Sequence, residues 1–538
     1  MSYELSPISH ELLNRNQKRE TNMLLQNFLE NTTNRTPDKT ALVVGKDRLT
    51  FQEVEEKSNQ LARALKDMGV ERGDRVAIHL DNSVEAVISI FGVLKADAVF
   101  SVLSPTIKSK KLAYILNNSQ ARVLITHRNK FRILQPIINQ LSHLDHTIFA
   151  GPKGFDGGLN SSIWDETLGG YKVTKCPTRN IDVDLASIIY TSGSTGEPKG
   201  VMLTHLNMVS AAHSITTYLE NNSNDIILSA LPLSFDYGLY QALMASLFGG
   251  TLVLERSFLY LFDVIRKIPE EKVTGFPLVP TMAAMLLQME NLTKVDVSSL
   301  RYITNTAAAL PVDHIKKLQS TFPHVMTYSM YGLTECKRVS YLPPAELDRR
   351  PTSVGRAMPN EEVYIVDERG QKLGPGQVGE LVVRGSNVMK GYWRDPNTTN
   401  KVLKPGPYPG EKVLYTGDLF KTDEDGYLYF VARKDDLIKS RGERISPKEV
   451  EDSLYQIKGV AEAAVMGVAD DILGQAIKAF IISNDHGQLT EKQVIAHCAK
   501  NLEFFMVPKY VEFVTSFPRT STGKTDKKEL SLPSALSA

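Results

Sequence analysis

The sequence predicts an α/β protein with a large N-terminal domain and a small C-terminal domain. The chain has 538 residues, which is more than one hydrophobic core usually serves. Strand-like and helix-like segments alternate through about the first 350 residues, and this alternation favours layered α/β structure with mainly parallel sheets. Past about residue 360, short strands separated by Gly- and Asp-rich turns take over, and a compact α+β pattern ends the chain.

The N-terminal elements follow from local patterns. A helix is expected around residues 22–30, and a second opens at Leu49-Thr-Phe51 and runs through Lys66, with Val54, Leu61, Ala62 and Leu65 at helical spacing. A turn into a buried strand is expected at 73–78, further strands at 98–102 and 122–126, and a helix at 82–94.

The C-terminal third changes character. Short strands at 362–366, 379–383 and 427–430 predict a small antiparallel sheet or β-barrel. Four consecutive charged residues, 433–436, then mark a domain boundary, which divides 1–434 from 435–538; a solvated turn is the alternative. Beyond it we expect helices at 447–455 and 491–501 and strands at 463–468 and 479–483.

Composition limits the function. The chain is 42% hydrophobic and 23% charged, with a net charge of +1, so we expect a soluble protein that binds neither nucleic acid nor an acidic membrane. Cys176, Cys336 and Cys498 lack CxxC spacing, which predicts free thiols without a disulfide framework or zinc site. The first twenty residues are polar, and the longest apolar run, 86–103, contains Lys95 and Asp97. We therefore expect no signal peptide or membrane span, and a cytoplasmic location.

A Gly/Ser-rich loop lies between two apolar strands in residues 187–205. Glycines let backbone N–H groups approach an anion, hydroxyls add donors, and Lys199 adds positive charge, so the loop suits a polyphosphate. It differs from a P-loop because Pro198 separates Gly196 from Lys199. A surface hairpin without a ligand is the alternative. The candidate phosphate-binding residues are Thr191, Ser192, Gly193, Ser194, Thr195, Gly196 and Lys199.

Five further motifs follow in order. They are Tyr331-Gly-Leu-Thr-Glu335, the segment 379–392, Tyr415-Thr-Gly-Asp418, the segment 433–442 and Pro518-Arg-Thr-Ser-Thr-Gly-Lys524. Together with the loop, they resemble the motifs of the adenylate-forming enzymes, which include acyl-CoA synthetases, peptide-synthetase adenylation domains and luciferases. The resemblance spans about residues 22–530. It implies two layered α/β subdomains and a small β-barrel, followed by a small mobile α+β domain, with ATP and Mg²⁺ as cofactors.

The resemblance also implies roles at the ATP site. The reaction joins a carboxylate to the α-phosphate of ATP and expels pyrophosphate, so fixed positive charge must offset the repulsion between two anions. Lys524 is the catalytic candidate, and an ordinary exposed lysine is the alternative. Glu335 would bind Mg²⁺ and Thr334 the α-phosphate. Asp418 and Arg433 would hold the ribose. The remaining candidates around ATP are Ala307, Ala308, Tyr331, Gly332 and Phe430.

A second half-reaction would transfer the acyl group from AMP to a thiol. The resemblance implies that the C-terminal domain rotates about Asp435, which removes Lys524 and brings in the face around Lys439 to Gly442. Lys439 is the second catalytic candidate. Gly442 would let a phosphopantetheine arm pass. Only 14 residues follow Lys524 in this sequence, which is too few for a carrier domain. We therefore expect a separate thiol acceptor, either a free-standing carrier protein or coenzyme A.

The acid substrate is indicated by Phe235-Asp236. Fatty and aryl acid activators often carry His after this Phe, whereas amino-acid activators carry Asp, and an unpaired carboxylate facing a fatty tail is costly to bury. Asp236 therefore favours an amino acid; an Asp turned to solvent is the alternative. The segments around 235–241 and 331–344 resemble stand-alone enzymes that activate L-proline. The candidate pocket residues are Asp236, Tyr237, Tyr240, Leu278, Met330 and Val339.

Two departures and two alternatives remain open. Asp97 stands where many relatives have Gly, and Thr306-Ala-Ala-Ala309 replaces the usual adenine-side segment. An acyl- or aryl-CoA ligase is the second interpretation, and a ligase-like binding protein without catalysis is the third.

Overall fold

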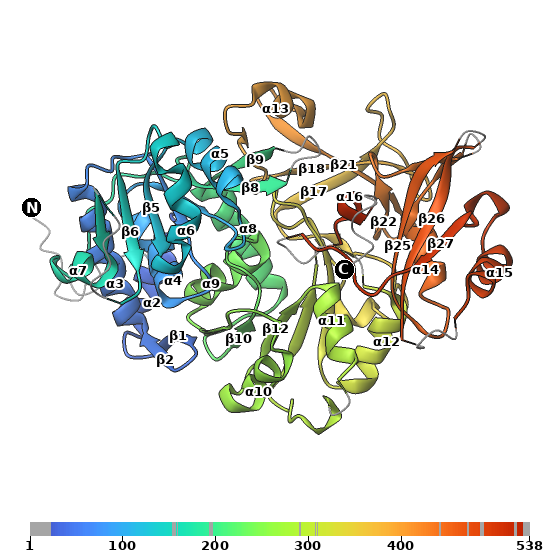
Figure 1. Cartoon of the computed structure of the whole chain (residues 1–538), viewed down its shortest axis with the longest axis horizontal. Helices are drawn as coiled ribbons and strands as arrows, with labels where there is room; N and C mark the ends of the chain where they lie inside the picture. Colours follow the sequence, from blue (N-terminus) through green and yellow to red (C-terminus); the bar gives the residue numbers. More distant parts are fainter. Residues whose placement is uncertain are drawn as a thin grey trace, which may run out of the picture.

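The computed structural model describes residues 23–152, 158, 160–192, 197–289, 292–306, 308, 310–440, 443–470, 473–484, 489–520 and 525–530. The N-terminal elements, blue to green in Figure 1, lie on the opposite side of the molecule from the C-terminal elements, orange to red. The expected large N-terminal and small C-terminal domains are confirmed.

The first N-terminal sheet has eight strands in the order β19-β9-β8-β4-β3-β5-β6-β7. All neighbours from β8 to β7 are parallel, whereas β9 runs antiparallel to β8 and β19 antiparallel to β9. The strands are β3 (Arg75–His79), β4 (Val99–Val102), β5 (Ala121–His127), β6 (His146–Ala150), β7 (Ser161–Ile163), β8 (Leu185–Ser192), β9 (Pro198–Thr204) and β19 (Gly391–Tyr392). The associated helices are α3 (Phe51–Asp67), α4 (Val84–Lys95), α5 (Ser109–Ser119), α6 (Phe131–Leu134), α7 (Trp164–Gly169) and α13 (Pro396–Val402).

The second sheet has nine strands in the order β16-β15-β14-β13-β12-β10-β11-β1-β2, parallel from β14 to β1. The strands are β1 (Thr40–Val44), β2 (Asp47–Thr50), β10 (Ile226–Ser229), β11 (Thr251–Leu254), β12 (Gly275–Leu278), β13 (Tyr302–Asn305), β14 (Met326–Tyr331), β15 (Ser340–Tyr341) and β16 (Arg356–Ala357). Its helices are α2 (Gln26–Arg35), α8 (His205–Tyr218), α9 (Asp236–Phe248), α10 (Leu261–Glu271), α11 (Pro280–Leu287) and α12 (Val312–Thr321). The expected alternation into mainly parallel sheets is therefore confirmed.

The small antiparallel sheet is open, so the predicted β-barrel is wrong. Its strands are β17 (Glu361–Val366), β18 (Gly379–Gly385), β20 (Leu403–Pro405), β21 (Lys412–Thr422) and β22 (Leu428–Arg433). The order is β17-β18-β21-β20, with β22 also on β21, and within the described residues no ladder joins β17 back to β20 or β22. A barrel requires every strand to have two neighbours, and here β17 and β20 are edges. One apolar core still joins this sheet to the other two.

The C-terminal domain has its own sheet and core. Strands β23 (Ile438–Ser440), β24 (Glu443–Ile445), β25 (Val460–Asp470), β26 (Gly474–Ser483) and β27 (Tyr510–Phe513) pack with α14 (Pro447–Leu454), α15 (Glu491–Asn501) and α16 (Lys527–Leu530). Ser446 Oγ donates to the Val431 carbonyl over 2.5 Å, and the rings of Tyr455 and His314 lie 6.0 Å apart. The start of α14 therefore contacts β22, and its C-terminal end contacts α12. The boundary at residue 434 stays a prediction.

Capping explains where α3 begins. Thr50 Oγ1 accepts a hydrogen bond from the Glu53 N–H over 3.2 Å, and the Glu53 carboxylate accepts one from the Thr50 N–H over 2.8 Å. This reciprocal arrangement satisfies N–H groups that have no partner inside the helix. It places the start of the helix at Phe51, as predicted.

Asp97 occupies a backbone conformation that glycine favours. Its φ is +64°, a left-handed conformation that glycine adopts without strain. Here the buried carboxylate accepts bonds from Thr178 Oγ1 (2.6 Å) and the Arg179 N–H (2.8 Å), and it pairs with Lys66 Nζ at 3.0 Å. These contacts offset the strain and tie the turn after α4 to the segment that precedes β8.

Three sequence expectations concern cysteines, membranes and metals. The three cysteines are buried free thiols, as predicted. In the part of the chain that the structure describes, no helix combines the length and apolar character needed to cross a bilayer. Within those same residues, no group of three or more His, Cys, Asp or Glu side chains has a metal-binding arrangement.

Candidate active site

The predicted phosphate loop connects β8 to β9. The two strands form an antiparallel hairpin in which Thr191 lies opposite Lys199. β19 extends the hairpin, since the Trp393 N–H donates to the Gly200 carbonyl over 2.7 Å. Thr191 and Lys199, which flank the loop, are half-buried, so their side chains are partly accessible to solvent. Gly193, Ser194, Thr195, Gly196 and the side chain of Ser192 lie outside the described residues.

Three side chains from separate elements meet beside this hairpin. The Tyr392 hydroxyl of β19 donates to Glu335 Oε1 over 2.8 Å, and Lys199 Nζ lies 5.7 Å from the centre of the Tyr392 ring. Burial, and then the neighbouring Glu335 carboxylate, raise the pKa of the Tyr392 hydroxyl, so it remains a donor. Tyr392 lies in one of the recognised motifs, but sequence reasoning gave it no role.

Glu335 fits the predicted Mg²⁺ role. It is half-buried, and Tyr392 fixes the orientation of its carboxylate through Oε1. A single oriented carboxylate suits Mg²⁺, which keeps several waters and shares its remaining positions with phosphate oxygens.

The predicted nucleoside residues converge on β21 and β22. The Tyr331 hydroxyl donates to Asp418 Oδ2 over 2.6 Å, and Arg433 Nε lies 3.6 Å from Asp418 Oδ1. Asp418 and Arg433 are directly opposite each other in the ladder. The Tyr331 ring packs 4.8 Å from Phe420 and 6.4 Å from Phe430, measured between ring centres. Phe420 is a further aromatic residue of this cluster, which the sequence did not single out.

The remaining predicted ATP residues lie in the adenine-side segment after β13 and in the turn after β14. Asn305 Nδ2 donates to the carbonyl of the exposed Ala308 over 3.0 Å, and Ala307 lies outside the described residues. At Gly332, a Cβ atom would come within 2.3 Å of the Lys337 carbonyl oxygen, so no larger residue fits without moving the backbone. Thr334 lies half-buried in the same turn.

The acid-pocket candidate Asp236 has a partner in the chain itself. It is the first residue of α9, it is 8% exposed, and its Oδ2 lies 3.3 Å from Lys337 Nζ. The premise of an unpaired carboxylate is therefore wrong, and so is the alternative of a solvent-facing one. Sequence reasoning missed Lys337, although the basic pair Lys337-Arg338 between Cys336 and Val339 was a visible signal.

The other pocket candidates are all buried, and two of them lie beside this pair. Lys337 Nζ lies 4.3 Å from the centre of the Tyr240 ring and 5.7 Å from that of Tyr237. The Tyr237 hydroxyl donates to the Thr304 carbonyl over 3.0 Å. Tyr218, which was not predicted, donates to Met330 Sδ over 3.0 Å. Leu278 ends β12, and Val339 follows the basic pair.

Arg338 is a second missed cation in this region. It is 2% exposed, and its guanidinium carbon lies 5.3 Å from the centre of the Tyr237 ring. Its Nε has no hydrogen-bond partner among the described residues. The acid pocket therefore combines one carboxylate and two cations with buried tyrosines.

The hinge and thiol candidates lie beyond β22. Asp435 is exposed in the turn between β22 and β23, and the adjacent Lys434 Nζ pairs with Glu380 Oε2 at 3.2 Å. Lys439 is exposed on β23, and its N–H donates to Gln475 Oε1 over 2.7 Å. Gly442 and Lys524 lie outside the described residues. Their roles, like that of Asp435, stay predictions.

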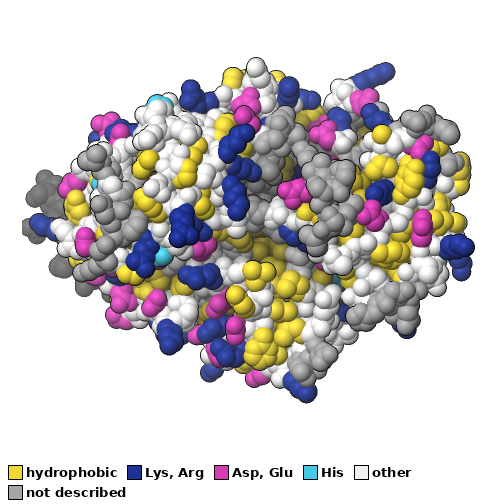
Figure 2. All heavy atoms as spheres, in the orientation of Figure 1, with side chains coloured by type: hydrophobic (Ala, Val, Ile, Leu, Met, Phe, Trp, Pro, Cys, Tyr) yellow, Lys and Arg dark blue, Asp and Glu magenta, His cyan; other side chains and the backbone are white. Residues whose placement is uncertain are grey.

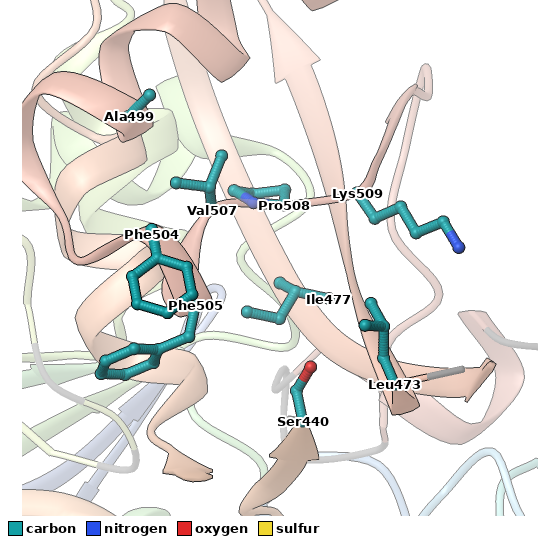
Figure 3. A pocket seen from close by; sticks show the side chains of 9 residues that line it. All are labelled: Ser440, Leu473, Ile477, Ala499, Phe504, Phe505, Val507, Pro508 and Lys509. Carbon is teal, nitrogen blue, oxygen red and sulfur yellow. The ribbon is translucent and has the colours of Figure 1, made fainter. Parts of the chain in front are cut away.

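A separate pocket of about 470 Å³ lies within the C-terminal domain (Figure 3). Its lining comes from β23, β26 with the preceding Leu473, α15 and the segment 504–509. Phe504 and Phe505 lie at one side, and Leu473 and Lys509 at the other. It contains none of the predicted ATP or acid residues. In the space-filling view the surface is also hollowed between the two parts of the molecule, and Lys and Arg side chains gather along one border of that hollow (Figure 2).

The sequence matches the family described as AMP-binding enzyme over residues 29–393, and the AMP-binding enzyme C-terminal domain over residues 449–524. The chain belongs to the AMP-binding enzyme family. This membership supports an ATP-dependent, AMP-forming acid–thiol ligase.

Three relatives show how broad the AMP-binding enzyme family is. The long-chain-fatty-acid–CoA ligase of Salmonella typhimurium is 30% identical over 94% of this chain and 94% of its own length. Tyrocidine synthase 3 of Brevibacillus parabrevis is 31% identical over 95% of this chain but 8% of its own length. The ATP-bound structure of MatB from Rhodopseudomonas palustris is similar with a TM-score of 0.86 and 28% identity, over 95% of this chain and 98% of that one.

Proposed function

We propose that this protein adenylates a small amino acid and transfers it to the phosphopantetheine thiol of a separate carrier protein, with L-proline as the first substrate to test. The observation that carries the proposal is Asp236, a buried carboxylate at the start of α9. A buried carboxylate recognises an ammonium group by charge and hydrogen bonding. Tyr237 and Tyr240, from the same helix, add flat aromatic walls that suit a small ring.

The ATP side supports the first half-reaction. Asp418 and Arg433 form a paired site for the ribose, and Tyr331 orients the Asp418 carboxylate. Lys199 and the loop after β8 would hold the phosphates, and Glu335 would hold Mg²⁺, which neutralises phosphate charge when bound. Lys524 would bridge the carboxylate and the α-phosphate. These assignments rest on residue chemistry, on placement and on the family resemblance.

The charge in the acid pocket argues against a fatty acid. Asp236, Lys337 and Arg338 are all at least nine-tenths buried in it, together with the hydroxyl groups of the tyrosines. Arg338 Nε has no hydrogen-bond partner among the described residues, and an alkyl tail would offer it none, whereas an unsatisfied buried polar group costs about 1–3 kcal/mol. A compact polar acid is therefore the better fit.

A second candidate function is supported by the Asp236–Lys337 pair. Because Lys337 already neutralises Asp236, the pocket does not require an ammonium group on the acid. The similarity to a long-chain-fatty-acid–CoA ligase agrees with this possibility. The chain would then be an acid–CoA ligase for an acid without an amine.

ATP–pyrophosphate exchange across a panel of acids separates the two functions. The sharpest comparison is L-proline against cyclopentanecarboxylate, because both place a carboxylate on a five-membered ring and only proline carries the ammonium. We expect exchange with an amino acid to be about 10- to 100-fold faster than with its amine-free partner, because a hydrogen bond to a charged group contributes about 1.5–3 kcal/mol. Exchange with amine-free acids alone would overturn the proposal in favour of the second function.

The thiol acceptor needs a separate assay. Once an acid is identified, its adenylate is offered to a phosphopantetheinylated carrier protein and to coenzyme A, and thioester formation is followed by mass spectrometry. We expect transfer to the carrier protein. Transfer to coenzyme A alone would reject that part of the proposal while leaving the adenylation step intact.

A further inference from the structure

Arg338 is a buried cation of the acid pocket to which the proposed reaction gives no role. We propose that Arg338 determines specificity by binding a second carboxylate, which the acid substrate carries on its side chain. The inference rests on the proposed adenylation of a small acid, but not on whether that acid has an amine. It names the class of the substrate as a compact dicarboxylic acid, which includes the acidic amino acids.

The acid pocket holds more positive than negative charge. Asp236 Oδ2 lies 3.3 Å from Lys337 Nζ, so these two charges form a pair. Arg338 is 2% exposed, and no carboxylate of the described residues forms an ion pair with it. A buried cation is costly unless an anion pairs with it. A carboxylate on the substrate would supply the missing negative charge.

The guanidinium group of Arg338 also has a hydrogen bond to offer. Its buried Nε has no hydrogen-bond partner in the part of the chain that the structure describes. A guanidinium presents its N–H donors in a planar fork that matches a carboxylate, often through parallel bonds. It keeps its positive charge wherever enzymes work, so this recognition does not depend on the release or uptake of a proton.

The side chain of Arg338 lies among the tyrosines of the acid pocket. Its guanidinium carbon is 5.3 Å from the centre of the Tyr237 ring. Burial raises the pKa of the Tyr218 hydroxyl to about 12, and the charge of Arg338 opposes that shift. Burial and then Asp236 raise the pKa of Tyr240, and Arg338 opposes this shift too. The cation is therefore close to the residues of α8 and α9 that surround the predicted acid site.

Backbone contacts fix the position of Arg338 within the protein. The amide of the buried Asn387 donates to the Cys336 carbonyl over 2.7 Å and to the Arg338 carbonyl over 3.2 Å. The next N–H along the chain, that of Val339, donates to the Tyr331 carbonyl over 2.9 Å. A recognition group that is already held in place loses little freedom on binding, which favours affinity.

Matched pairs of acids test the inference by ATP–pyrophosphate exchange. L-Glutamate is compared with L-norvaline, and glutarate with pentanoate, because each pair differs only in a terminal carboxylate or methyl group. L-Aspartate and succinate serve as shorter dicarboxylic acids. In whichever series the enzyme uses, with or without the amine, we expect kcat/KM to be about 10- to 100-fold higher for the dicarboxylic member. A kcat/KM that is equal within each pair, or higher for the methyl-ended member, would overturn the proposal.

Two substitutions at Arg338 then show whether this residue is the source of the preference. In Arg338→Met, KM for the dicarboxylic acid should rise about 10- to 100-fold, whereas kcat/KM for its methyl-ended partner should not fall. The preference within the pair should therefore disappear. Arg338→Lys keeps the charge without the planar fork, so it should retain part of the preference.

The matched control is Arg301→Met. The guanidinium carbon of Arg301 also lies over a tyrosine ring, 4.9 Å from the centre of Tyr302, and Arg301 pairs with Asp225 at 2.8 Å. Arg301 is not among the predicted ATP or acid residues. Its loss can lower the amount of folded enzyme, but the ratio of kcat/KM within each pair should stay within about twofold of the parent.

A merely structural arginine would behave as Arg301 does. Loss of its contacts with Tyr237 would lower the amount of active enzyme, and hence kcat, equally for both members of a pair. An unchanged ratio in Arg338→Met and Arg338→Lys would therefore overturn the proposal. Circular dichroism melting identifies a variant that fails to fold, in which case the other variant and the preference of the parent enzyme carry the test.

The two proposals fail in distinguishable ways. Exchange that is faster with L-proline or L-norvaline than with any dicarboxylic acid would reject the role of Arg338 and leave the proposed function standing. Exchange with glutarate or succinate, but with no amino acid, would reject the proposed amino-acid substrate and support the role of Arg338.

Discussion

At the scale of single residues, Tyr392 links the phosphate side of the site to the expected magnesium ligand. Its hydroxyl orients Glu335, and Lys199 lies over its ring. We predict that Tyr392→Phe raises the Mg²⁺ concentration needed for half-maximal exchange about tenfold, because partners that orient metal ligands typically contribute 10–100-fold to affinity. Mg²⁺ titration of pyrophosphate exchange measures the effect.

The matched control for that prediction is Tyr429→Phe. The Tyr429 hydroxyl donates to Asp423 over 3.1 Å, outside the predicted ATP residues. Tyr429→Phe removes the same hydroxyl group as Tyr392→Phe, but at a place away from Glu335. The Mg²⁺ requirement of this control should therefore stay within about twofold of the parent. An unchanged requirement in Tyr392→Phe would show that Glu335 needs no orientation by Tyr392.

The sequence motifs identified the residues of the ATP site, but they did not reveal the two buried cations of the acid pocket. Tyr331, Asp418 and Arg433 were found because they lie in short motifs, and they are in contact. Lys337 and Arg338 were missed because a charged residue usually marks a solvated surface. Their burial depends on α8 and α9, which lie about a hundred residues away in the chain.

At the scale of elements, Asp97 illustrates how a side chain can replace a glycine. Burial alone would raise the pKa of its carboxyl, but bonds from Thr178, Arg179 and Lys66 lower it overall. A depressed pKa means stability that is present above the unfolded value of about 3.9 and is lost as pH falls through the folded pKa. We predict that Asp97→Asn lowers the free energy of unfolding by about 1–3 kcal/mol at pH 7.

Denaturant unfolding of the parent and Asp97→Asn at pH 7, 5 and 3.5 measures this effect. The difference between the two should be the same at pH 7 and 5. It should shrink at pH 3.5, because there the Asp97 carboxyl of the unfolded parent takes up a proton while the folded carboxyl, with its lowered pKa, resists it. A difference that persists unchanged at the lowest pH would mean that the ionised carboxylate is not the source of the stability.

Periodicity predicted the elements well because each is fixed by local burial. The helices at α3, α4, α14 and α15 and the strands at β3, β4 and β5 all form near their expected bounds. The prediction of a barrel was wrong because closure depends on pairing between strands that are far apart in the chain, and no local sequence pattern encodes that pairing.

At the scale of the whole molecule, the C-terminal domain contacts the rest of the chain through pairs such as Ser446 with Val431 and Tyr455 with His314. Asp435 lies exposed in the connecting turn, where a change of φ and ψ meets little resistance. We predict that Asp435→Pro leaves pyrophosphate exchange within about twofold of the parent and slows thioester formation at least about 100-fold, because proline fixes φ near −65°. The two assays on one preparation check this.

Asp435→Ala is the control for the hinge, since it removes the same carboxylate without fixing φ. It should retain thioester formation. Equal thioester rates in Asp435→Pro and the parent would refute the assignment of the hinge to this turn.

The central claim is that fixed positive charge joins two anions, the acid and the α-phosphate of ATP, and that Lys524 supplies it. The most direct measurement is acid-dependent pyrophosphate exchange by Lys524→Ala, with the exposed Lys500→Ala as control. Exchange should fall at least about 100-fold in Lys524→Ala, the scale of losing one group that stabilises transition-state charge, and should be unchanged in Lys500→Ala. Exchange at the parental rate in Lys524→Ala would contradict the claim.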